Sequence, residues 1–300
     1  MIYYYCIAMA AALCWAVASL VSADVTRTIG GLAFNRLRLF FVSIMLITYT
    51  FYINTWNTIS VDYLTIIIIS GIVGIFLGDT LLFIALQKIG PRRNNILFSL
   101  AAPFTVVINI FFLNELASTI SIIGCFVVFF GVVFAISYGD KKGSSEHRWE
   151  KVEGPLYIGI ILSIGAALCQ AIGLVMMKPI LSDGADPIAS AAIRTTISCI
   201  FLSFTFFLNY EVFNTKVNLT SKIIYQSILS GFLGMALGMS LLLIALQKAD
   251  AGIVATLSST SPIMILFLLW ILTKKNTLLW CMGGDNYCNF WNRINFYLLI

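Results

Sequence analysis

Charged side chains are scarce in this sequence of 300 residues, in which 13 acidic and 18 basic residues make up only 10% of the chain. Soluble proteins are about a quarter charged, because charged groups keep their surfaces in contact with water. Here hydrophobic residues supply 60%, and the mean hydropathy is +0.97. The chain therefore has too few polar groups to cover its own surface. This excludes soluble enzymes and secreted disulfide modules, and the few scattered basic residues exclude a surface that tracks nucleic-acid phosphates.

The motifs of common enzymes are also missing. The sequence has one histidine, His147, and it has no Gly-rich phosphate loop, no HExxH zinc motif and no Gly-x-Ser-x-Gly elbow. Its seven cysteines form no CxxC pair, and cysteine in apolar runs behaves as a small hydrophobic residue. We therefore expect no enzyme, no cofactor and no metal. An intramembrane enzyme acting through Asp79 alone is the least favoured alternative.

Apolar runs of about 20 residues, the length that crosses a bilayer as a helix, follow one another along the chain. The only extended hydrophilic segment, 140–154, divides them five from five. The first run has no basic region before it, so we interpret it as a retained helix rather than a signal peptide. We predict an all-α integral membrane protein of ten transmembrane helices, with spans near 2–22, 37–55, 64–87, 94–114, 118–138, 155–177, 188–209, 223–246, 252–273 and 277–300.

The chain contains one sequence twice. Residues 71–88 read GIVGIFLGDTLLFIALQK and residues 231–248 read GFLGMALGMSLLLIALQK, with eleven of the eighteen positions identical. Residues 11–16 likewise match 166–171. Because each copy has an odd number of spans, the second copy must enter the membrane from the opposite side. We therefore predict two inverted five-helix repeats, residues 1–139 and 155–300, with hydrophilic linker 140–154 between them and a site near the midplane.

Several features together resemble the EamA branch of the drug/metabolite transporter superfamily over about residues 5–275. They are Ala-Leu-Cys-Trp ending at Trp15, Asn35 before Arg38, Ala-Leu-Gln-Lys ending at Lys88, Ala-Ala-Pro103 followed by Glu115, and Gly124 with Gly131.

The resemblance implies ten helices around a central cavity and alternating-access transport of small metabolites, often export of amino acids or related compounds. We therefore expect a secondary-active exporter in a bacterial-type inner or plasma membrane. Its expected partners are a small solute, coupled protons and the lipid bilayer, and a homodimer stays open. The alternative is a non-transporting membrane assembly or sensor protein. The orientation of the termini is left open, because the positive-inside rule and the resemblance point opposite ways.

Glycines recur at one spacing in both copies, which places them on one helix face and lets two backbones approach closely. We expect helix packing rather than solute contact at Gly71, Gly74, Gly78, Gly231, Gly234 and Gly238. Pro103 and Pro262 are expected to break helices. The hydroxyls of residues 256–261 would then satisfy backbone groups freed by Pro262, or line the pathway.

Six polar or aromatic residues are candidates for the cavity: Trp15, Arg38, Asp79, Asn109, Gln170 and Arg194. A carboxylate inside a span costs about 2.5–3.5 kcal/mol to insert, so Asp79 must face a cavity or a partner. It serves either proton coupling or an ammonium group, or it pairs with a structural arginine. The repeat mates Arg38 and Arg194 could hold an anionic group, although snorkelling to the headgroups is favoured.

Trp15 and Gln170 differ within otherwise matching hexapeptides, so they could distinguish the two ends of a solute. Packing is the default role for Trp15. The last stretch is too polar for its place, with Asn286, Asn289, Asn292 and Asn295 at regular spacing. We hypothesise a frameshift or sequencing error near residue 281.

Overall fold

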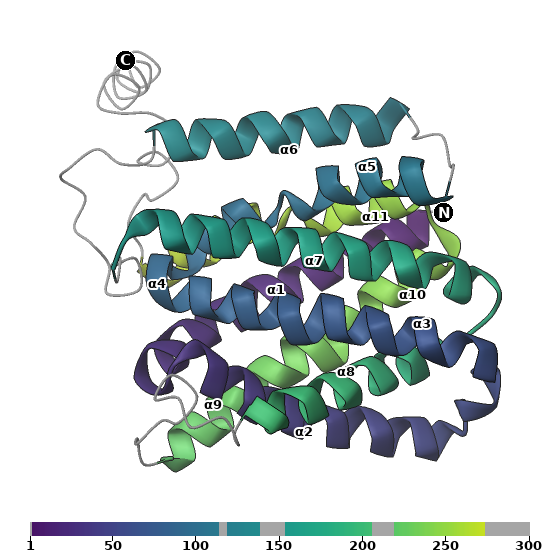
Figure 1. Ribbon diagram of the computed structural model, residues 1–300. Helices are drawn as coiled ribbons and strands as arrows, with labels where there is room; N and C mark the ends of the chain where they lie inside the picture. The colour runs from purple at the N-terminus through teal and green to yellow at the C-terminus, as the bar shows by residue number, and fades with distance from the viewer. Residues whose placement is uncertain (1, 114–118, 139–153, 206–218, 274–300) are drawn as a thin grey trace, which may run out of the picture.

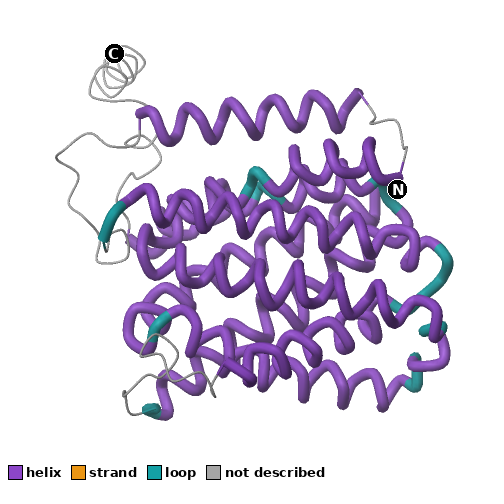
Figure 2. Tube along the Cα trace, in the orientation of Figure 1, coloured by secondary structure: helices purple, strands orange, loops and turns teal. Residues whose placement is uncertain are grey.

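The computed structural model describes residues 2–113, 119–138, 154–205 and 219–273. Within that part the chain is almost entirely helical and contains no strand (Figure 2). The helices are α1 (Ile2–Ile29), α2 (Gly31–Ile53), α3 (Val61–Gly71), α4 (Gly78–Phe98), α5 (Ala101–Leu113), α6 (Thr119–Tyr138), α7 (Leu156–Ser182), α8 (Pro187–Phe204), α9 (Ser221–Gly231), α10 (Ser240–Lys248), α11 (Ala251–Ser258) and α12 (Ser261–Thr273). A short 3₁₀ helix, η1 (Trp56–Thr58), links α2 to α3. Most of the linker, the last span 277–300 and the suspected frameshift lie outside the described residues.

The helices pack side by side as one bundle (Figure 1). Six helical stretches of the described chain are long and apolar enough to cross a membrane: 2–29, 31–53, 61–98, 156–182, 187–204 and 221–248. Three shorter apolar helices cover 101–112, 122–131 and 251–265. The all-helical fold is thus confirmed, while the count of ten stays a prediction. Large apolar side chains such as Phe111, Phe112 and Phe126 are exposed on the bundle, as expected for a surface that faces lipid.

Both copies of the glycine repeat form the same unusual structure. The segments η2 (Ile72–Leu77) and η5 (Phe232–Met239) are π-helical. Each connects two α-helices, α3 to α4 and α9 to α10, in one continuous run. A π-helix adds one residue to the turn and often lies at a functional site. The duplicated sequence therefore produces a duplicated change of helix geometry.

The boundary between the expected third and fourth spans is a kink inside α4. Gly90 has a φ of 80°, which glycine adopts without the penalty that a Cβ brings. Pro91 follows it, and its missing N–H removes one bond from the helical ladder. In the second copy Asp250 begins a new helix at this place, and its side chain accepts a 3.0 Å hydrogen bond from the backbone of Ile253.

Each copy is interrupted once more, at Ser99–Leu100 and at Ser259–Thr260. Pro103 and Pro262 lie in the first turn of the helices that follow, α5 and α12, where a proline replaces an N–H that has no intrahelical partner. The interruptions touch, because the Ser259 hydroxyl donates to the carbonyl oxygen of Ser99 at 3.2 Å. A side chain at one break thus bonds to a backbone carbonyl at the other.

The two copies are packed into each other. Helix α1 lies against α9, η5 and α10 of the second copy, and α7 lies against α3, η2 and α4 of the first. In Figure 1, α1 leads from the side marked N toward the opposite side, whereas α7 leads back to that side. The largest buried apolar cluster correspondingly contains residues from both copies, including Leu39, Ile75, Met177 and Leu242.

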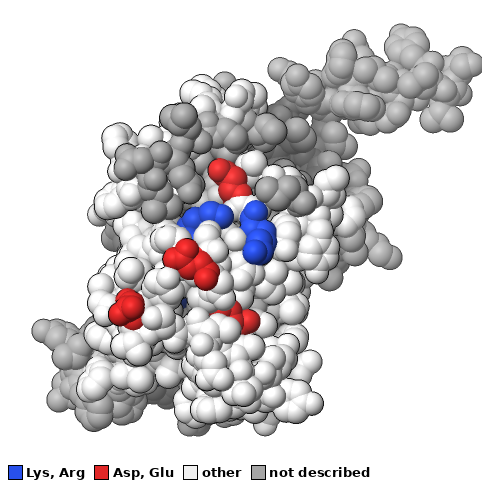
Figure 3. All heavy atoms as spheres, turned by 90° about the vertical axis from the view of Figure 1, so that its right-hand side faces the viewer, with Lys and Arg blue, Asp and Glu red and all other residues white. Residues whose placement is uncertain are grey.

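Charged side chains of both signs gather on the end of the bundle where the connections α2–α3 and α7–α8 lie (Figure 3). There the Tyr63 hydroxyl donates to Asp183 at 2.8 Å, and Asp186 caps α8 by accepting from the Ala189 amide at 2.7 Å. The bond from Tyr63 to Asp183 joins the two copies at the polar end of an otherwise apolar bundle.

Candidate functional site

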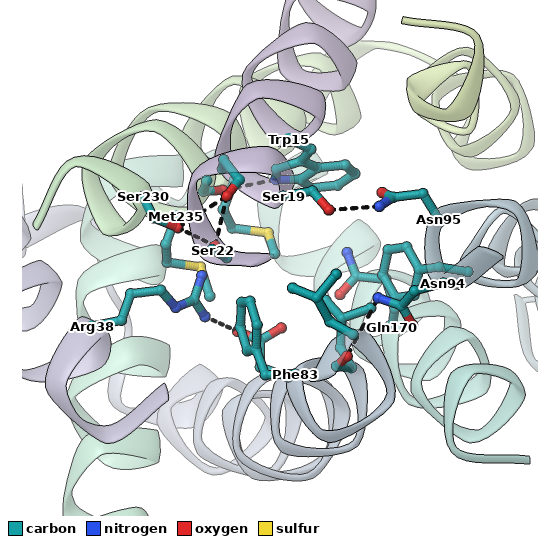
Figure 4. A pocket seen from close by; sticks show the side chains of 17 residues that line it. Trp15, Ser19, Ser22, Arg38, Phe83, Asn94, Asn95, Gln170, Ser230 and Met235 are labelled. Carbon is teal, nitrogen blue, oxygen red and sulfur yellow. Dashed lines mark hydrogen bonds and ion pairs between the residues drawn. The ribbon is translucent and has the colours of Figure 1, made fainter. Parts of the chain in front are cut away.

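A cavity lies between the two copies. Its volume is about 60 Å³, enough to hold several waters. Helices α1, α2 and α4 of the first copy surround it together with α7, α9 and η5 of the second (Figure 4). Its polar and aromatic lining residues are Trp15, Ser19, Ser22, Arg38, Asp79, Phe83, Asn94, Asn95, Phe98, Gln170 and Ser230, and Met235 and Met239 add thioethers.

An ion pair between α2 and α4 forms one wall of the cavity. Arg38 Nη2 donates to Asp79 Oδ2, and the same nitrogen lies 3.2 Å from Asn35 Oδ1. The guanidinium carbon lies 4.5 Å from the centre of the Phe83 ring, a cation–π distance. Both charged side chains are almost completely buried, at 5% and 11% exposure. Arg38 therefore does not snorkel, and its charge is compensated inside the protein.

Trp15 and Gln170, repeat mates in α1 and α7, lie on the same cavity. Trp15 Nε1 donates to the carbonyl oxygen of Gly234 at 2.7 Å, so the ring is fixed against η5 of the other copy. Gln170 is only 4% exposed, and its Nε2 has no hydrogen-bond partner in the described part of the chain. The two repeat mates therefore differ in hydrogen bonding. The Trp15 N–H has a partner, whereas the Gln170 side-chain N–H groups have none in the described residues.

Arg194 and Asn109 do not line this cavity. Arg194, on α8, is fully buried behind Met239, and its Nη1 lies 3.9 Å from the Met239 sulfur. A Cβ on Gly74 or Gly173 would lie 3.0 or 3.1 Å from Arg194 Nη2, so the guanidinium occupies a slot that only glycines leave open. Asn109 is buried in α5. Four of the six candidates thus meet in one cavity, and Arg194 lies behind Met239, one of its lining residues.

The glycine repeats pack crosswise against the other copy. A Cβ on Gly71 would lie 2.9 Å from the backbone of Arg194, and a Cβ on Gly231 would lie 3.1 Å from the Arg38 side chain. A Cβ on Gly78 would lie 3.2 Å from the Cys169 side chain, and a Cβ on Gly238 would lie 2.9 Å from the Trp15 ring. The glycines thus bring each π-helix against the arginine and the first helix of the opposite copy.

Hydroxyl bonds repeat this crosswise pattern. Ser230 donates to the carbonyl of Ala18 at 3.3 Å and shares a 2.6 Å hydrogen bond with Ser22. In the other half Ser70 donates to the carbonyl of Gly173 at 3.0 Å. These bonds hold each glycine segment against the first helix of the other copy.

Four of the five hydroxyls in residues 256–261 have backbone partners. Thr256, Ser258, Ser259 and Thr260 each donate to a carbonyl three or four residues back. Ser258 and Ser259, together with Ser261, also border a small space that shares Trp15 and Gln170 with the main cavity. None of these bonds ends on the carbonyl of Ser258, four residues before Pro262, so both roles expected of these hydroxyls stay predictions.

Sequence reasoning missed the neutral polar lining. Asn95 Nδ2 donates to Ser19 at 2.7 Å, and Asn94 accepts from Ser163 at 2.7 Å. Adjacent amides just after a basic pair were the available signal, but they look like part of a connecting loop. Among the described residues no group of histidine, cysteine or acidic side chains is arranged to hold a metal.

These features define a class: a helical, multi-pass membrane protein built from two similar halves around a cavity with polar and apolar lining. The family model of the EamA-like transporter family matches the chain twice, over residues 2–137 and 157–284. The protein belongs to that family. No curated protein matches the chain. A solved structure described only as a crystal structure of a protein is similar in fold, with a TM-score of 0.70 and 15% sequence identity, covering 91% of this chain and 89% of that one.

Proposed function

We propose that this protein is a secondary-active transporter that exports a small organic metabolite, such as an amino acid or related compound, across a bacterial-type inner or plasma membrane. The observation that carries the proposal is the cavity between the two copies, which membership of a transporter family places in a functional context. Polar groups in the middle of a bilayer are expensive, so a lining of amides, hydroxyls and an ion pair indicates a site that receives a polar solute.

The proposed cycle is alternating access. The opposite courses of α1 and α7 support an inverted repeat (Figure 1), in which the two halves exchange conformations around a fixed central site. The paired π-helices and the paired breaks supply corresponding points of altered helix geometry in each half. We also propose that protons are coupled through Asp79, since its protonation would release Arg38 from the ion pair. A homodimer would be detected by light scattering of the purified protein.

Transport in sealed vesicles tests this function. Purified protein is reconstituted into proteoliposomes loaded with a panel of labelled amino acids and their analogues, and efflux is followed with and without a pH gradient. The variants Gly74→Leu and Gly234→Leu place a large side chain between the copies, and we expect folded protein with little transport. Gly131→Leu in α6 is the control, because a Cβ at Gly131 has no neighbour within 4 Å.

Two other functions make different predictions in the same assay. A membrane assembly or sensor protein moves no solute of the panel, and an intramembrane enzyme changes a solute chemically without moving it. Efflux that is unaffected by leucine at both Gly74 and Gly234 would contradict the alternating-access cycle.

A further inference from the structure

The central charges of the two copies do not match. Asp79 and Met239 each directly follow the third glycine of their repeat, and Arg38 and Arg194 are repeat mates. In the first half the arginine binds a carboxylate, Arg38 to Asp79. In the second half the equivalent contact is Arg194 Nη1 to the Met239 sulfur, at 3.9 Å. A thioether is a weak acceptor and has no charge, so Arg194 lacks the counter-ion that its repeat mate has.

The buried centre consequently has one excess positive charge. Among the described residues the buried charged side chains are Arg38, Arg194 and Asp79. Asp79 interacts electrostatically with both arginines, but its hydrogen-bonded partner is Arg38. A buried charge without its own partner is strongly unfavourable in a low-dielectric interior. The site would therefore be stabilised by one further anion.

Several nitrogen donors around the centre have no hydrogen-bond partner among the described residues. In the described chain Arg38 Nε, Gln170 Nε2 and Arg194 Nε and Nη2 are buried without a hydrogen-bond partner. Gln170 and Arg38 line the cavity (Figure 4). An ionised carboxylate only accepts hydrogen bonds, and it bonds most strongly to charged donors. The free donors and the excess positive charge therefore both favour a carboxylate.

We propose that the transported solute supplies the missing carboxylate. This rests on the proposed function and narrows its substrate class to small organic monocarboxylates. The carboxylate lies between Arg38 and Arg194, in the place of the flexible Met239 side chain, with Gln170 as a further donor. The organic part lies against the aromatic face of Trp15.

The same charges disfavour an amino group on the solute. Asp79 is the one buried carboxylate of the described residues, and it is already bonded to Arg38. An ammonium group entering the cavity would find no free anion and would meet a positive field. A carboxylate without an α-amino group is therefore the preferred form, and a zwitterion is bound less well.

A matched set of four solutes tests the charge preference on the wild-type protein. The set is 4-methylpentanoate, its neutral amide, leucine and 3-methylbutylamine, which share one branched body and differ in the charged group. Binding is measured as the rise in the thermal unfolding midpoint of the detergent-purified protein, because a ligand stabilises the state that it binds. We expect 4-methylpentanoate to bind roughly ten- to a hundredfold more tightly than the amide, the range for a charge-assisted hydrogen bond. Leucine should bind more weakly than the acid.

Two substitutions at Met239 test the place of the carboxylate. Met239→Asp supplies an internal counter-ion for Arg194, whereas Met239→Asn has the same size without the charge. We expect Met239→Asp to weaken 4-methylpentanoate binding about tenfold more than Met239→Asn does. If Met239→Asp does not fold, Arg194→Lys against Arg194→Gln gives the same comparison, since lysine keeps the charge and glutamine does not.

The outcomes separate the two proposals. Transport of leucine or the amine in preference to the acid would overturn the carboxylate assignment and leave the transporter intact. Equal binding by Met239→Asp and Met239→Asn would overturn the location between the arginines. The transport function itself would be contradicted if none of the four solutes stabilised the protein and vesicles carrying the protein transported neither these solutes nor any other amino acid or analogue.

Discussion

Replacing Gly31 by alanine tests whether close packing of α2 on α4 positions the central ion pair. Gly31 is the first residue of α2. A Cβ there would lie 2.5 Å from the carbonyl carbon and oxygen of Phe83 and 2.7 Å from the Ile84 nitrogen. All three are backbone atoms, which cannot rotate away as a side chain can. Helix α2 would therefore have to move away from α4.

The cost follows from overpacking. Forcing an extra carbon into a packed interior costs about 1–3 kcal/mol, and the helix preference of alanine over glycine returns at most about 1 kcal/mol. The shift also strains the 3.0 Å hydrogen bond from the Gly31 amide to Gln87. We expect a net loss of about 2 kcal/mol in the free energy of unfolding. At roughly 2–4 °C per kcal/mol for a chain of this size, the unfolding midpoint falls by about 4–8 °C.

The same movement reaches the cavity. Arg38 lies two turns along α2 from Gly31, and Asp79 lies one turn before Phe83 on α4. Separating the helices lengthens the bond between the two charges, so solute binding should weaken together with stability.

The assay is thermal unfolding of the detergent-purified protein followed by intrinsic fluorescence, with Gly131→Ala as the control. Gly131 is also helical, but a Cβ there has no neighbour within 4 Å, so its midpoint should equal or exceed the wild-type value. A midpoint for Gly31→Ala at or above that of Gly131→Ala would refute the reasoning.

Three further predictions use the same assay. Asp79→Asn leaves the Arg38 guanidinium buried without its carboxylate and should lower the free energy of unfolding by about 3–5 kcal/mol. Adding Arg38→Met should restore part of this loss, so a double variant no more stable than Asp79→Asn would contradict the pairing. Ser22→Ala and Ser230→Ala each remove one partner of a 2.6 Å hydrogen bond and should cost about 0.5–1.5 kcal/mol, with the double variant costing less than the two added together; strict additivity is the contrary result. Trp15→Phe keeps the ring but loses the 2.7 Å bond to η5 and should cost about 0.5–1.5 kcal/mol, so an unchanged midpoint would show that the bond contributes nothing.

The repeat in the sequence was the most informative predictor of the fold. Because the glycine segments align without a gap, a feature of one copy recurs at the same place in the other, and this holds for η2 and η5 and for the two helix breaks. That these segments are π-helical could not be predicted, since hydropathy reports which faces are apolar and not which carbonyl each N–H bonds. Helix breaks were expected at Pro103 and Pro262, and the chain breaks at residues 99–100 and 259–260, so that each proline lies in the first turn of the next helix.

Charge inside apolar spans predicted Arg38 and Asp79 at the cavity, and the mismatch between the matching hexapeptides predicted Trp15 and Gln170, whereas the other neutral lining residues were not predicted. Arg38 and Asp79 had to find a partner or a cavity, and they meet each other at its wall. Serines and asparagines are tolerated in spans by bonding to nearby carbonyls, so Ser22 and Asn95 carried no distinctive signal. Asn109 lies on an apolar helix, α5, that does not line the main cavity, and only tertiary packing decides which helices surround it.

The departures from internal symmetry are the places where function is expected. If the two halves were identical, exchanging their conformations would give two states of equal energy, one open to each side. Asp79 has no acidic counterpart in the second half. When the two halves exchange conformations, Arg194, which has no carboxylate partner, would take the environment that Arg38 and its carboxylate had before. The two states therefore differ in energy. A solute can shift such an equilibrium only through contacts that differ between the two states. A carboxylate beside Arg194 makes such a contact, because it gives the second half the negative charge that Asp79 gives the first.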